Sequence, residues 1–412
     1  MIKKVSATSV NALLLLTIMC FYLQPVSSQK PTPITQNTMM GIDTFIGNRI
    51  RQSGMVGLAA ALIVDKKVVW SKGYGFADKE SGRPFTTNTI INLGSIGKVF
   101  TGVCLMKAVE AGKLSLDEDI NHYLPFQVRN PDFPDDKITL RHIATHTSGI
   151  TDRAPVYDST YFYGGDPPEP LEKFLQDYFL PQGRFYAKDN FLHHKPGTYR
   201  EYSNIATALA GYIIERVTGE QLNQYSRQHI FTPLGMKHTG WFFREIDVKN
   251  HSSHYDMQND TLKKIPLYGL TTYPDGGVRS SVNELSRFFI AMLNNGEYNG
   301  KRILRKESVA EITRYQFTPA NKPENVNIQK LNSGLFWATK QGATRIGHGG
   351  TDPGVKTEML SDLSKEVAVI IFTNTSLSDK NLFRFYVSVM DELFRRGAEI
   401  KAGNAHTSIT GP

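Results

Sequence analysis

The chain has 412 residues, a formal net charge of +8 and two cysteines. Its basic residues are spread along the sequence without a Lys/Arg block, so it lacks the concentrated basic patch of nucleic-acid-binding proteins, and no nucleic-acid partner is expected. A chain of this length exceeds what one compact core usually holds, so two lobes are expected.

Residues 1–28 resemble a secretory signal peptide. Lys3 and Lys4 give a positively charged start, and residues 12–23 form an apolar core that is short for a membrane span. We therefore expect cleavage before Gln29 and a secreted or periplasmic protein, with an uncleaved membrane anchor as the alternative. No later run is long and apolar enough to cross a bilayer, so no stable membrane insertion is expected once the signal is removed.

Hydrophobic patterning predicts one folded domain after the signal, divided into two lobes. A polar, Pro-containing segment precedes the domain and reads as a linker, and the C-terminal residues read as a flexible tail. The predicted boundaries are a linker at 29–38, a domain at 39–396 with one α/β lobe at about 39–94 and 271–396 and a helical lobe at about 95–270, and a tail at 397–412.

Five segments of the sequence have the pattern of β-strands. Two lie early in the chain and are joined by a turn at Asp65-Lys66, and three lie late with short connections. The five segments are residues 58–64, 67–70, 344–347, 355–360 and 367–372. This arrangement predicts an α+β fold, in which an antiparallel five-stranded-type sheet is built from both chain ends and an all-helical lobe is inserted between them.

The first candidate site residues lie where a strand-like segment ends and a helix begins. Ser95 is followed three residues later by Lys98, and such positions share one face of a helix. The hydroxyl and the amine can therefore meet at the helix N-terminus, which suits a serine nucleophile with a lysine base. Gly94 and Gly97 leave the backbone open to a substrate. A lysine base must be neutral, and burial is expected to lower its pKa.

By itself this Ser-x-x-Lys pattern is weak evidence for catalysis. Ser27 and Lys30, in the predicted cleavage region, match it equally well. An ordinary N-cap serine followed by a solvated lysine would give the same spacing. The interpretation therefore depends on what other residues could complete the site.

Tyr202 and Asn204 form the second candidate element. Tyr202-Ser203-Asn204 is the only Tyr-x-Asn in the chain, and it follows the loop-like Pro196-Gly197-Thr198 and precedes a predicted helix. A phenol close to cations can carry a proton between nucleophile and leaving group, and an asparagine can hydrogen-bond a substrate amide. The alternative is a turn tyrosine followed by an N-cap asparagine.

His348, Gly350 and Thr351 form the third candidate element, at the end of a predicted strand. Glycines there allow a substrate backbone to lie along the strand edge. His348 would supply a proton-dependent donor or a partial charge, and the Thr351 N–H could form an oxyanion hole with the N–H of Ser95. A glycine turn with an incidental histidine is the alternative.

The sequence contains no motif that requires a metal or another cofactor, and none is expected. His142 and His146 are four residues apart, and His251 and His254 are three apart, but there is no H-E-x-x-H pattern and no cysteine pair. Capping and surface roles fit these histidines better. Once the signal is removed Cys104 stands alone, so no intrachain disulfide is expected.

The three elements, in the order Ser95-x-x-Lys98, Tyr202-x-Asn204 and His348-x-Gly350, together resemble the serine β-lactamase and penicillin-binding-protein superfamily. The similarity is to the branch with class C β-lactamases, D-amino-acid peptidases and related esterases, and it covers about residues 40–395. Flanking segments that also match are Ile138 to Gly149, Pro196 to Asn204, Pro233-Leu-Gly-Met236 and Gly276-Gly-Val-Arg-Ser280.

This resemblance implies an α/β lobe and a helical lobe with the site between them. It implies acylation of Ser95 by an amide or ester carbonyl, proton transfer shared by Lys98 and Tyr202, an oxyanion hole at the amides of Ser95 and Thr351, and substrate orientation by Asn204. His348-Gly-Gly replaces the Lys-Thr-Gly usual in β-lactamases, which is more similar to the aminopeptidases, carboxypeptidases and esterases of the superfamily. β-Lactam hydrolysis is therefore not the expected activity.

The expected function is that of an exported serine hydrolase acting on a small amide or peptide bond. An acyl esterase is the second enzymatic interpretation, and a non-enzymatic binding or matrix protein that keeps the fold is the third. The loop at 151–195 is expected to shape the pocket, with four aromatic candidates: Tyr161, Tyr163, Phe185 and Tyr186. The sequence names neither the substrate nor the oligomeric state.

Overall fold

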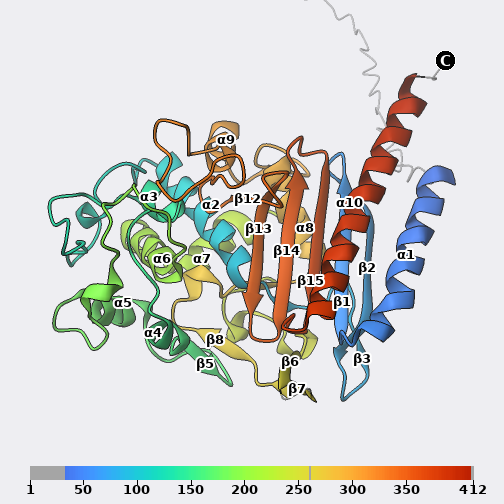
Figure 1. The fold of residues 1–412 in the computed structure, drawn as a ribbon, viewed down its shortest axis with the longest axis horizontal. Coiled ribbons are helices and arrows are strands. Elements are labelled where there is room, and N and C mark those ends of the chain that lie inside the picture. The colour runs from blue at the N-terminus through green and yellow to red at the C-terminus, as the bar shows by residue number, and fades with distance from the viewer. Residues whose placement is uncertain (1–32, 259–260, 410–412) are drawn as a thin grey trace, which may run out of the picture.

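The computed structural model describes residues 33–258 and 261–409; the predicted signal peptide, 1–28, lies outside them. Within this part of the chain, an antiparallel sheet of seven strands forms a central layer with helices on both faces (Figure 1). In spatial order its strands are β12 (Ala338–Lys340), β13 (Arg345–Asp352), β14 (Val355–Asp362), β15 (Val367–Thr373), β1 (Gly57–Val64), β2 (Lys67–Asp78) and β3 (Arg83–Pro84). The predicted α+β class and the assembly of the sheet from both chain ends are confirmed.

The sheet is wider than the five strands predicted, because β12 and β3 add a short strand at each edge. Strand β2 is also longer than predicted. It continues past Gly73 and Gly75 to Asp78, so these glycines do not end it. A Cβ on Gly73 would lie 2.1 Å from the carbonyl oxygen of Phe85, so glycine here allows a close approach of the neighbouring chain.

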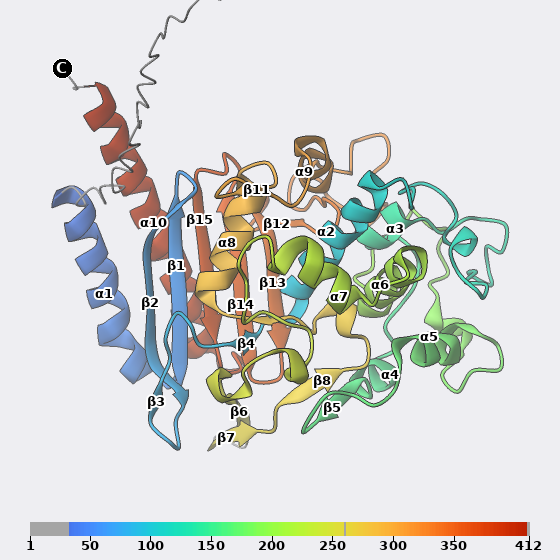
Figure 2. The ribbon, with the colours of Figure 1, turned by 180° about the vertical axis from the view of Figure 1, so that it is seen from behind.

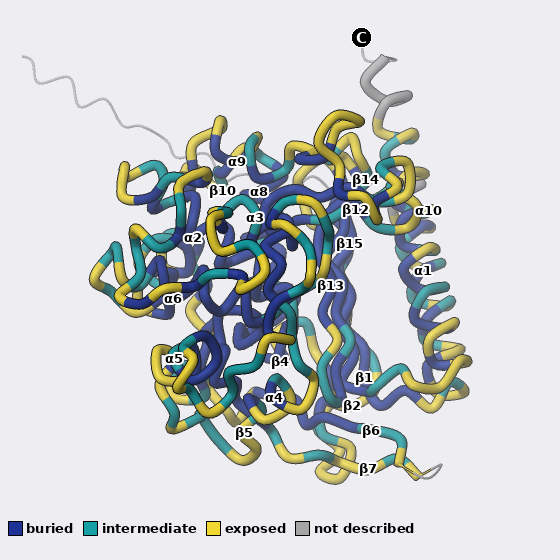
Figure 3. Tube along the Cα trace, turned by 60° about the vertical axis from the view of Figure 1, so that its left-hand side comes forward, coloured by how far each residue is buried: buried dark blue, intermediate teal, exposed yellow. Residues whose placement is uncertain are grey.

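Strand β1 shows why the sheet is buried on both faces. Its odd-numbered residues from Ala59 to Ile63 pack into one hydrophobic cluster, and its even-numbered residues from Leu58 to Val64 pack into the other. Successive side chains of a strand point to opposite faces, so an unbroken apolar run requires a cover on each side. The tube coloured by burial shows the sheet strands as a dark band between the two layers (Figure 3).

Helices α1 (Pro33–Ser53) and α10 (Lys380–Ile409) pack side by side over one face of the sheet (Figure 1). Both extend beyond their predicted limits. The linker prediction for 29–38 is wrong from Pro33 onward: a proline in a first turn lacks only an N–H that would be unpaired anyway. The tail prediction for 397–412 is wrong up to Ile409, because Ile400 is buried against the sheet and Lys401 bonds Asp65.

The opposite face of the sheet is covered by α8 and by the inserted helical region (Figure 2). The helices here are α2 (Gly97–Glu110), α3 (Leu140–Ala144), α4 (Ala154–Asp158), α5 (Leu171–Phe179), α6 (Asn204–Thr218), α7 (Leu222–Ser226), α8 (Val282–Leu293) and α9 (Lys306–Thr313). Four two-stranded ladders complete the fold: β4 (Ile91–Asn92) with β9 (Arg279–Ser280), β5 (Tyr161–Tyr163) with β8 (Tyr268–Leu270), β6 (His254–Gln258) with β7 (Thr261–Ile265), and β10 (Glu297–Tyr298) with β11 (Lys301–Arg302).

The inserted helices follow their sequence patterns closely. Helix α6 ends at Thr218, where Gly219 takes the left-handed conformation that a C-cap glycine favours. None of the described helices is long and apolar enough to cross a membrane. The division into lobes near residues 95 and 270 stays a prediction.

Candidate active site

The Ser95 turn connects strand β4 to helix α2. Residues Gly94–Ile96 form a single 3-10 turn, and α2 follows at Gly97. Gly94 has a φ of +54°, in the left-handed region that glycine adopts without strain. The turn leaves Ser95 half-buried at the open end of the helix, while Lys98 is fully buried in the first helical turn.

Lys98 has three hydrogen-bond acceptors around its amine. Nζ lies 3.2 Å from Oγ of Ser95, 2.5 Å from Oδ1 of Asn204 and 2.9 Å from the carbonyl oxygen of Asp275. Burial by itself lowers the pKa of Lys98, but Tyr202 and Asp275 outweigh it, and the pKa lies above its ordinary value. Burial therefore does not by itself make this lysine neutral, because its partners favour the ammonium form.

Asp152 holds the N-terminus of α6 and was missed by the sequence reasoning. Its carboxylate accepts from the backbone N–H groups of Asn204 at 2.7 Å and Ile205 at 2.9 Å, and from the Ser203 hydroxyl at 2.9 Å. It also accepts from Nδ2 of Asn204 at 2.8 Å, which turns Oδ1 of that amide toward Lys98. The only signal in the sequence was an acidic residue three positions after the Thr-Ser-Gly149 segment.

Tyr202 lies between two histidines at the mouth of the site. Its ring centroid is 4.3 Å from that of His146 and 6.4 Å from that of His348, and Nζ of Lys98 lies 4.9 Å from the centre of the ring. Burial holds the pKa of His146 well below its ordinary value, and its Nδ1 accepts from the backbone N–H of Ser203. His146 is therefore a neutral support for the Tyr202–Asn204 segment, whereas its predicted neighbour His142 closes a capping box with Thr139.

Strand β13 packs directly against the Ser95 turn. A Cβ on Gly350 would lie 2.2 Å from the carbonyl oxygen of Leu93 and 3.0 Å from the backbone nitrogen of Ser95, so only glycine fits. The Thr357 hydroxyl of the neighbouring strand donates to the same Leu93 carbonyl at 2.7 Å. These contacts bring the backbone of Thr351 beside that of Ser95, the pairing required of an oxyanion hole.

His348 lies in the middle of β13, because the strand extends to Asp352. Its Nδ1 lies 2.8 Å from the carbonyl oxygen of Gly349. Burial holds its pKa well below the ordinary value, and Lys340 and Lys98 add to this effect. Of the two roles predicted for His348, the low pKa favours the partial charge of a neutral imidazole over the proton-dependent donor.

Two acids lie beneath the site. Burial raises the pKa of Asp275 to about 6 although Lys98 opposes this, and Tyr157 donates to its Oδ1 at 3.0 Å. Burial, followed by the charge of Asp275, raises the pKa of Asp352 to about 7, and Tyr161 donates to this carboxyl at 3.0 Å. Of the four loop aromatics, Tyr161 thus supports the floor of the site.

Phe185, another of the four, packs against Phe174 at the edge of the hydrophobic core and plays no part in the floor.

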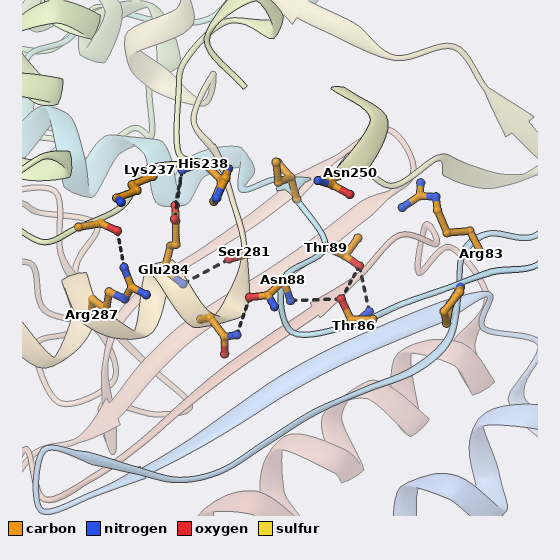
Figure 4. A pocket seen from close by; sticks show the side chains of 14 residues that line it. Arg83, Thr86, Asn88, Thr89, Lys237, His238, Asn250, Ser281, Glu284 and Arg287 are labelled. Carbon is orange, nitrogen blue, oxygen red and sulfur yellow. Dashed lines mark hydrogen bonds between the residues drawn. The ribbon is translucent and has the colours of Figure 1, made fainter. Parts of the chain in front are cut away.

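One cavity borders the candidate site, and a larger one lies away from it. A cavity of about 230 Å³ lies beside Tyr202 and His348. A larger one of about 720 Å³ lies between β3, the loop 84–90 and the start of α8, and Figure 4 shows its polar wall. No predicted site residue lines the larger cavity, and its carboxylate, Glu284, accepts hydrogen bonds from His238 and Thr239. Of these two cavities, only the smaller one is lined by predicted site residues, Tyr202 and His348; Ser95 lines neither.

The structure thus brings all seven predicted site residues to one place: Ser95, Lys98, Tyr202, Asn204, His348, Gly350 and Thr351. Among the described residues, no three His, Cys, Asp or Glu side chains gather in a way that would hold a metal ion. The arrangement provides a hydroxyl, a buried cation, a phenol and paired backbone donors, which are the groups that acyl transfer needs.

Comparison with known proteins places this arrangement in a family. A family model described as Beta-lactamase matches residues 42–386. Protein flp of Staphylococcus aureus strain MW2 is 24% identical over 83% of this chain; the match covers 64% of that relative, so the chain spans less than two thirds of its length.

Two solved structures share the fold. A penicillin-binding protein homologue from Pyrococcus abyssi, described as octameric, superposes with a TM-score of 0.67 and 25% identity, covering 85% of this chain and 76% of the other. D-amino acid amidase from Ochrobactrum anthropi SV3, complexed with L-phenylalanine amide, gives a TM-score of 0.69 and 21% identity, covering 90% and 99%.

Proposed function

This chain belongs to the beta-lactamase family, and we propose on that premise that it is a serine hydrolase cleaving a small amide or peptide bond through an acyl-enzyme at Ser95. The observation that carries the proposal is the fully buried Lys98, whose Nζ lies 3.2 Å from the Ser95 hydroxyl and is held there by Asn204. A buried, charged lysine aimed at a half-buried serine is costly to maintain as a purely structural feature.

In the proposed reaction, Oγ of Ser95 attacks the substrate carbonyl and its proton passes to the Lys98–Tyr202 pair. Because the partners of Lys98 favour its charged form, the pair must first lose one proton, and Tyr202 then accepts the proton with the ammonium beside it. The backbone N–H groups of Ser95 and Thr351 stabilise the oxyanion.

Deacylation repeats these steps with water as the nucleophile. The pair gives its proton to the leaving group during acylation; in deacylation it takes one from the attacking water and passes it to Oγ of Ser95 as the acyl–oxygen bond breaks. Asn204, fixed by Asp152, orients the substrate amide. We further propose that the protein is exported, on the composition of residues 1–28.

The test is Ser95→Ala in the purified protein, with Ser364→Ala, at an exposed serine, as the control. The panel consists of D-amino-acid amides and short acyl esters, and covalent labelling by a fluorophosphonate is followed by mass spectrometry. Loss of both turnover and adduct in Ser95→Ala alone is the expected result. Unchanged hydrolysis in Ser95→Ala would refute the mechanism.

Two other functions are separated by the same experiments. An esterase would turn over matched esters far faster than the corresponding amides. A binding or matrix protein would give no adduct with a fluorophosphonate or a fluorescent penicillin under any condition. The contact between Ser95 and Lys98 favours an enzyme over the binding protein, which has no use for it.

A further inference from the structure

The larger cavity, away from the candidate active site, is a polar cleft whose wall comes from four separate parts of the chain. These parts are β3 with the loop 84–90, the turn at 235–238, Asn250, and the start of α8 (Figure 4). Its volume of about 720 Å³ lies within the range of about 300–1,000 Å³ that small-molecule sites occupy. The cleft is therefore large enough for a ligand of its own.

Cationic side chains outnumber acidic ones in the wall of this cleft. Arg83, Lys237 and Arg287 line it, and among the described residues that do so Glu284 is the only acid. None of these four side chains forms an ion pair with another described residue. Like charges that gather without ion pairs make the surface around them electropositive, and such clefts attract anions.

Glu284 is bonded to the protein itself and offers little to a ligand. The residue is buried, and each of its carboxylate oxygens lies 3.1 Å from the backbone nitrogen of His238. One of these oxygens also accepts from the Thr239 hydroxyl at 2.7 Å. These bonds hold the turn at 235–238 against α8. The one acid of the wall thus has a structural role and leaves the cations without a paired counter-charge.

The two arginines of the wall are anchored but keep most of their donors free. An arginine side chain has five N–H donors. Arg83 donates to the carbonyl oxygen of His251 at 2.6 Å, and Arg287 donates to the carbonyl oxygen of Gly235. Lys237 is exposed and has no hydrogen-bond partner among the described residues. Because the guanidinium groups are already held in place, they lose less conformational entropy when they bind an anion.

The cations lie at opposite ends of the cleft, with uncharged polar groups between them. Figure 4 shows Arg287 and Lys237 at one end and Arg83 at the other. The stretch between these ends carries hydroxyl and amide groups, among them those of Thr86 and Asn88. A molecule that fills the cleft therefore meets a cation at each end and neutral hydrogen-bonding groups along its middle.

The geometry points to this cleft as a second ligand site, for a small hydroxylated molecule with an anionic group at each end. Arg287 and Lys237 bind one phosphate or carboxylate and Arg83 binds the other, because guanidinium and ammonium groups form short, strong hydrogen bonds to both kinds of anion. The hydroxyl and amide groups between them bind the body of the ligand. The inference does not depend on the proposed function, because it uses no residue of the candidate active site.

The test measures binding by calorimetry with two matched sets of probes. One set is mannitol phosphorylated at both ends, at one end and at neither; the other is glucarate, gluconate and glucitol, which carry two, one and no carboxylates. In at least one set we expect the Kd of the doubly anionic member to be about tenfold or more below that of the singly anionic one. The set that shows this difference identifies the anion. Equal binding of singly and doubly anionic probes in both sets, or no binding of any probe, would overturn the inference.

Single substitutions tie this binding to the two ends of the cleft. Lys237→Gln replaces an exposed side chain without a partner, so folding should be unaffected, and Arg83→Gln acts at the other end. In each variant the doubly anionic probe should bind about tenfold more weakly and lose its advantage over the singly anionic one. The controls are Arg384→Gln, at an exposed arginine on α10, and Lys340→Gln, in the smaller cavity. Binding that only Lys340→Gln weakens, or that neither cleft variant weakens, would contradict the site.

A final variant separates this inference from the proposed function. Ser95→Ala should bind the doubly anionic probe with the Kd of the wild type, whether or not the wild type hydrolyses any substrate. Loss of all hydrolase activity in the wild type would therefore leave the second site intact. A Kd that Ser95→Ala changes severalfold would show that the probe occupies the candidate active site instead.

Discussion

Lys98 and Lys340 both lie near Tyr202, on different elements. They differ in the hydrogen-bond acceptors that the protein offers to their charged amines. Lys98, on α2, has Asn204, the Asp275 carbonyl and the Ser95 hydroxyl within hydrogen-bond distance. Lys340, on β12, has no such partner among the described residues. Accordingly the pKa of Lys98 lies above its ordinary value, whereas burial lowers the pKa of Lys340.

The contrast shows that burial alone does not decide the protonation state of a lysine. Both side chains lose solvent, which disfavours the charge in each case. What differs is whether the protein supplies acceptors and a counter-charge. At Lys98 the chain supplies them itself, so the cation is a fixed part of the site. At Lys340 no described side chain lies within hydrogen-bond distance of the amine, and only the charge of Glu358 favours its ammonium form.

The largest effect is expected from Lys98→Met, which removes the fixed cation. Hydrolysis should fall by about a thousandfold or more, because the serine loses its proton-transfer partner. The free energy of unfolding should also fall, by about 3 kcal/mol, because Asp275 is left as an uncompensated buried acid. Steady-state kinetics and denaturant unfolding measure the two quantities. A stable Lys98→Met variant with full activity would contradict the difference drawn between Lys98 and Lys340.

A smaller effect is expected from Asp152→Asn, which acts on Lys98 through Asn204. The new amide offers two donors to a site that already contains four, so α6 should lose about 2 kcal/mol of its N-terminal stabilisation. With the Asn204 amide no longer fixed, kcat should fall by about ten- to a hundredfold. Asp158→Asn, at an exposed position on α4, is the control. Equal kcat in the two variants would contradict the positioning role.

Asp275→Asn should shift the pH dependence more than the maximal rate. Ionised Asp275 raises the pKa of Lys98, and its own pKa of about 6 means that it is charged at neutral pH. Without it the Lys98–Tyr202 pair loses its proton more easily, so the acidic limb of kcat/KM should move to lower pH by about one unit. The difference from wild type should vanish below pH 6, where Asp275 is protonated. A limb that moves to higher pH would reverse the assigned sign.

The smallest effect, opposite in sign to that of Lys98→Met, is expected from Lys340→Met. Replacing a half-buried, unpaired lysine by an apolar side chain of similar length should raise the free energy of unfolding by about 1 kcal/mol in the absence of substrate. Denaturant unfolding at pH 7 checks this, with Lys330→Met as the surface control. Destabilisation comparable to that of Lys98→Met would show that Lys340 has an internal partner after all.

The fold and the candidate reacting groups could be predicted from the sequence, whereas the charge states of those groups could not. Apolar strand patterns are local, so strands β1 and β15 could be predicted from them. The Ser95 and Lys98 pairing also follows from helical spacing. The charge state of Lys98 could not be predicted, because it depends on Asp275, which is 177 residues away in the chain.

The same reason explains the other misses. Asp152 caps a helix that begins about fifty residues later, and no local pattern marks that contact. Ile400 extends α10 because it packs against the sheet, whereas its own neighbourhood in the sequence looks like a polar tail. A residue whose role depends on partners far away in the chain has no local sequence pattern that would identify it.

Gly350 packs closely against the Ser95 turn, and this contact decides how late in synthesis the proposed site can be complete. The hydrogen bond from Thr357 to Leu93 joins positions 264 residues apart. Strand β1 can pair with β15 only after β15 has been synthesised. A ribosome that has made Ser95 must add most of the remaining chain before the backbone of Thr351 can lie beside it. Folding dominated by such distant pairings is slow. The nascent chain therefore carries its serine without reactivity until synthesis is almost finished.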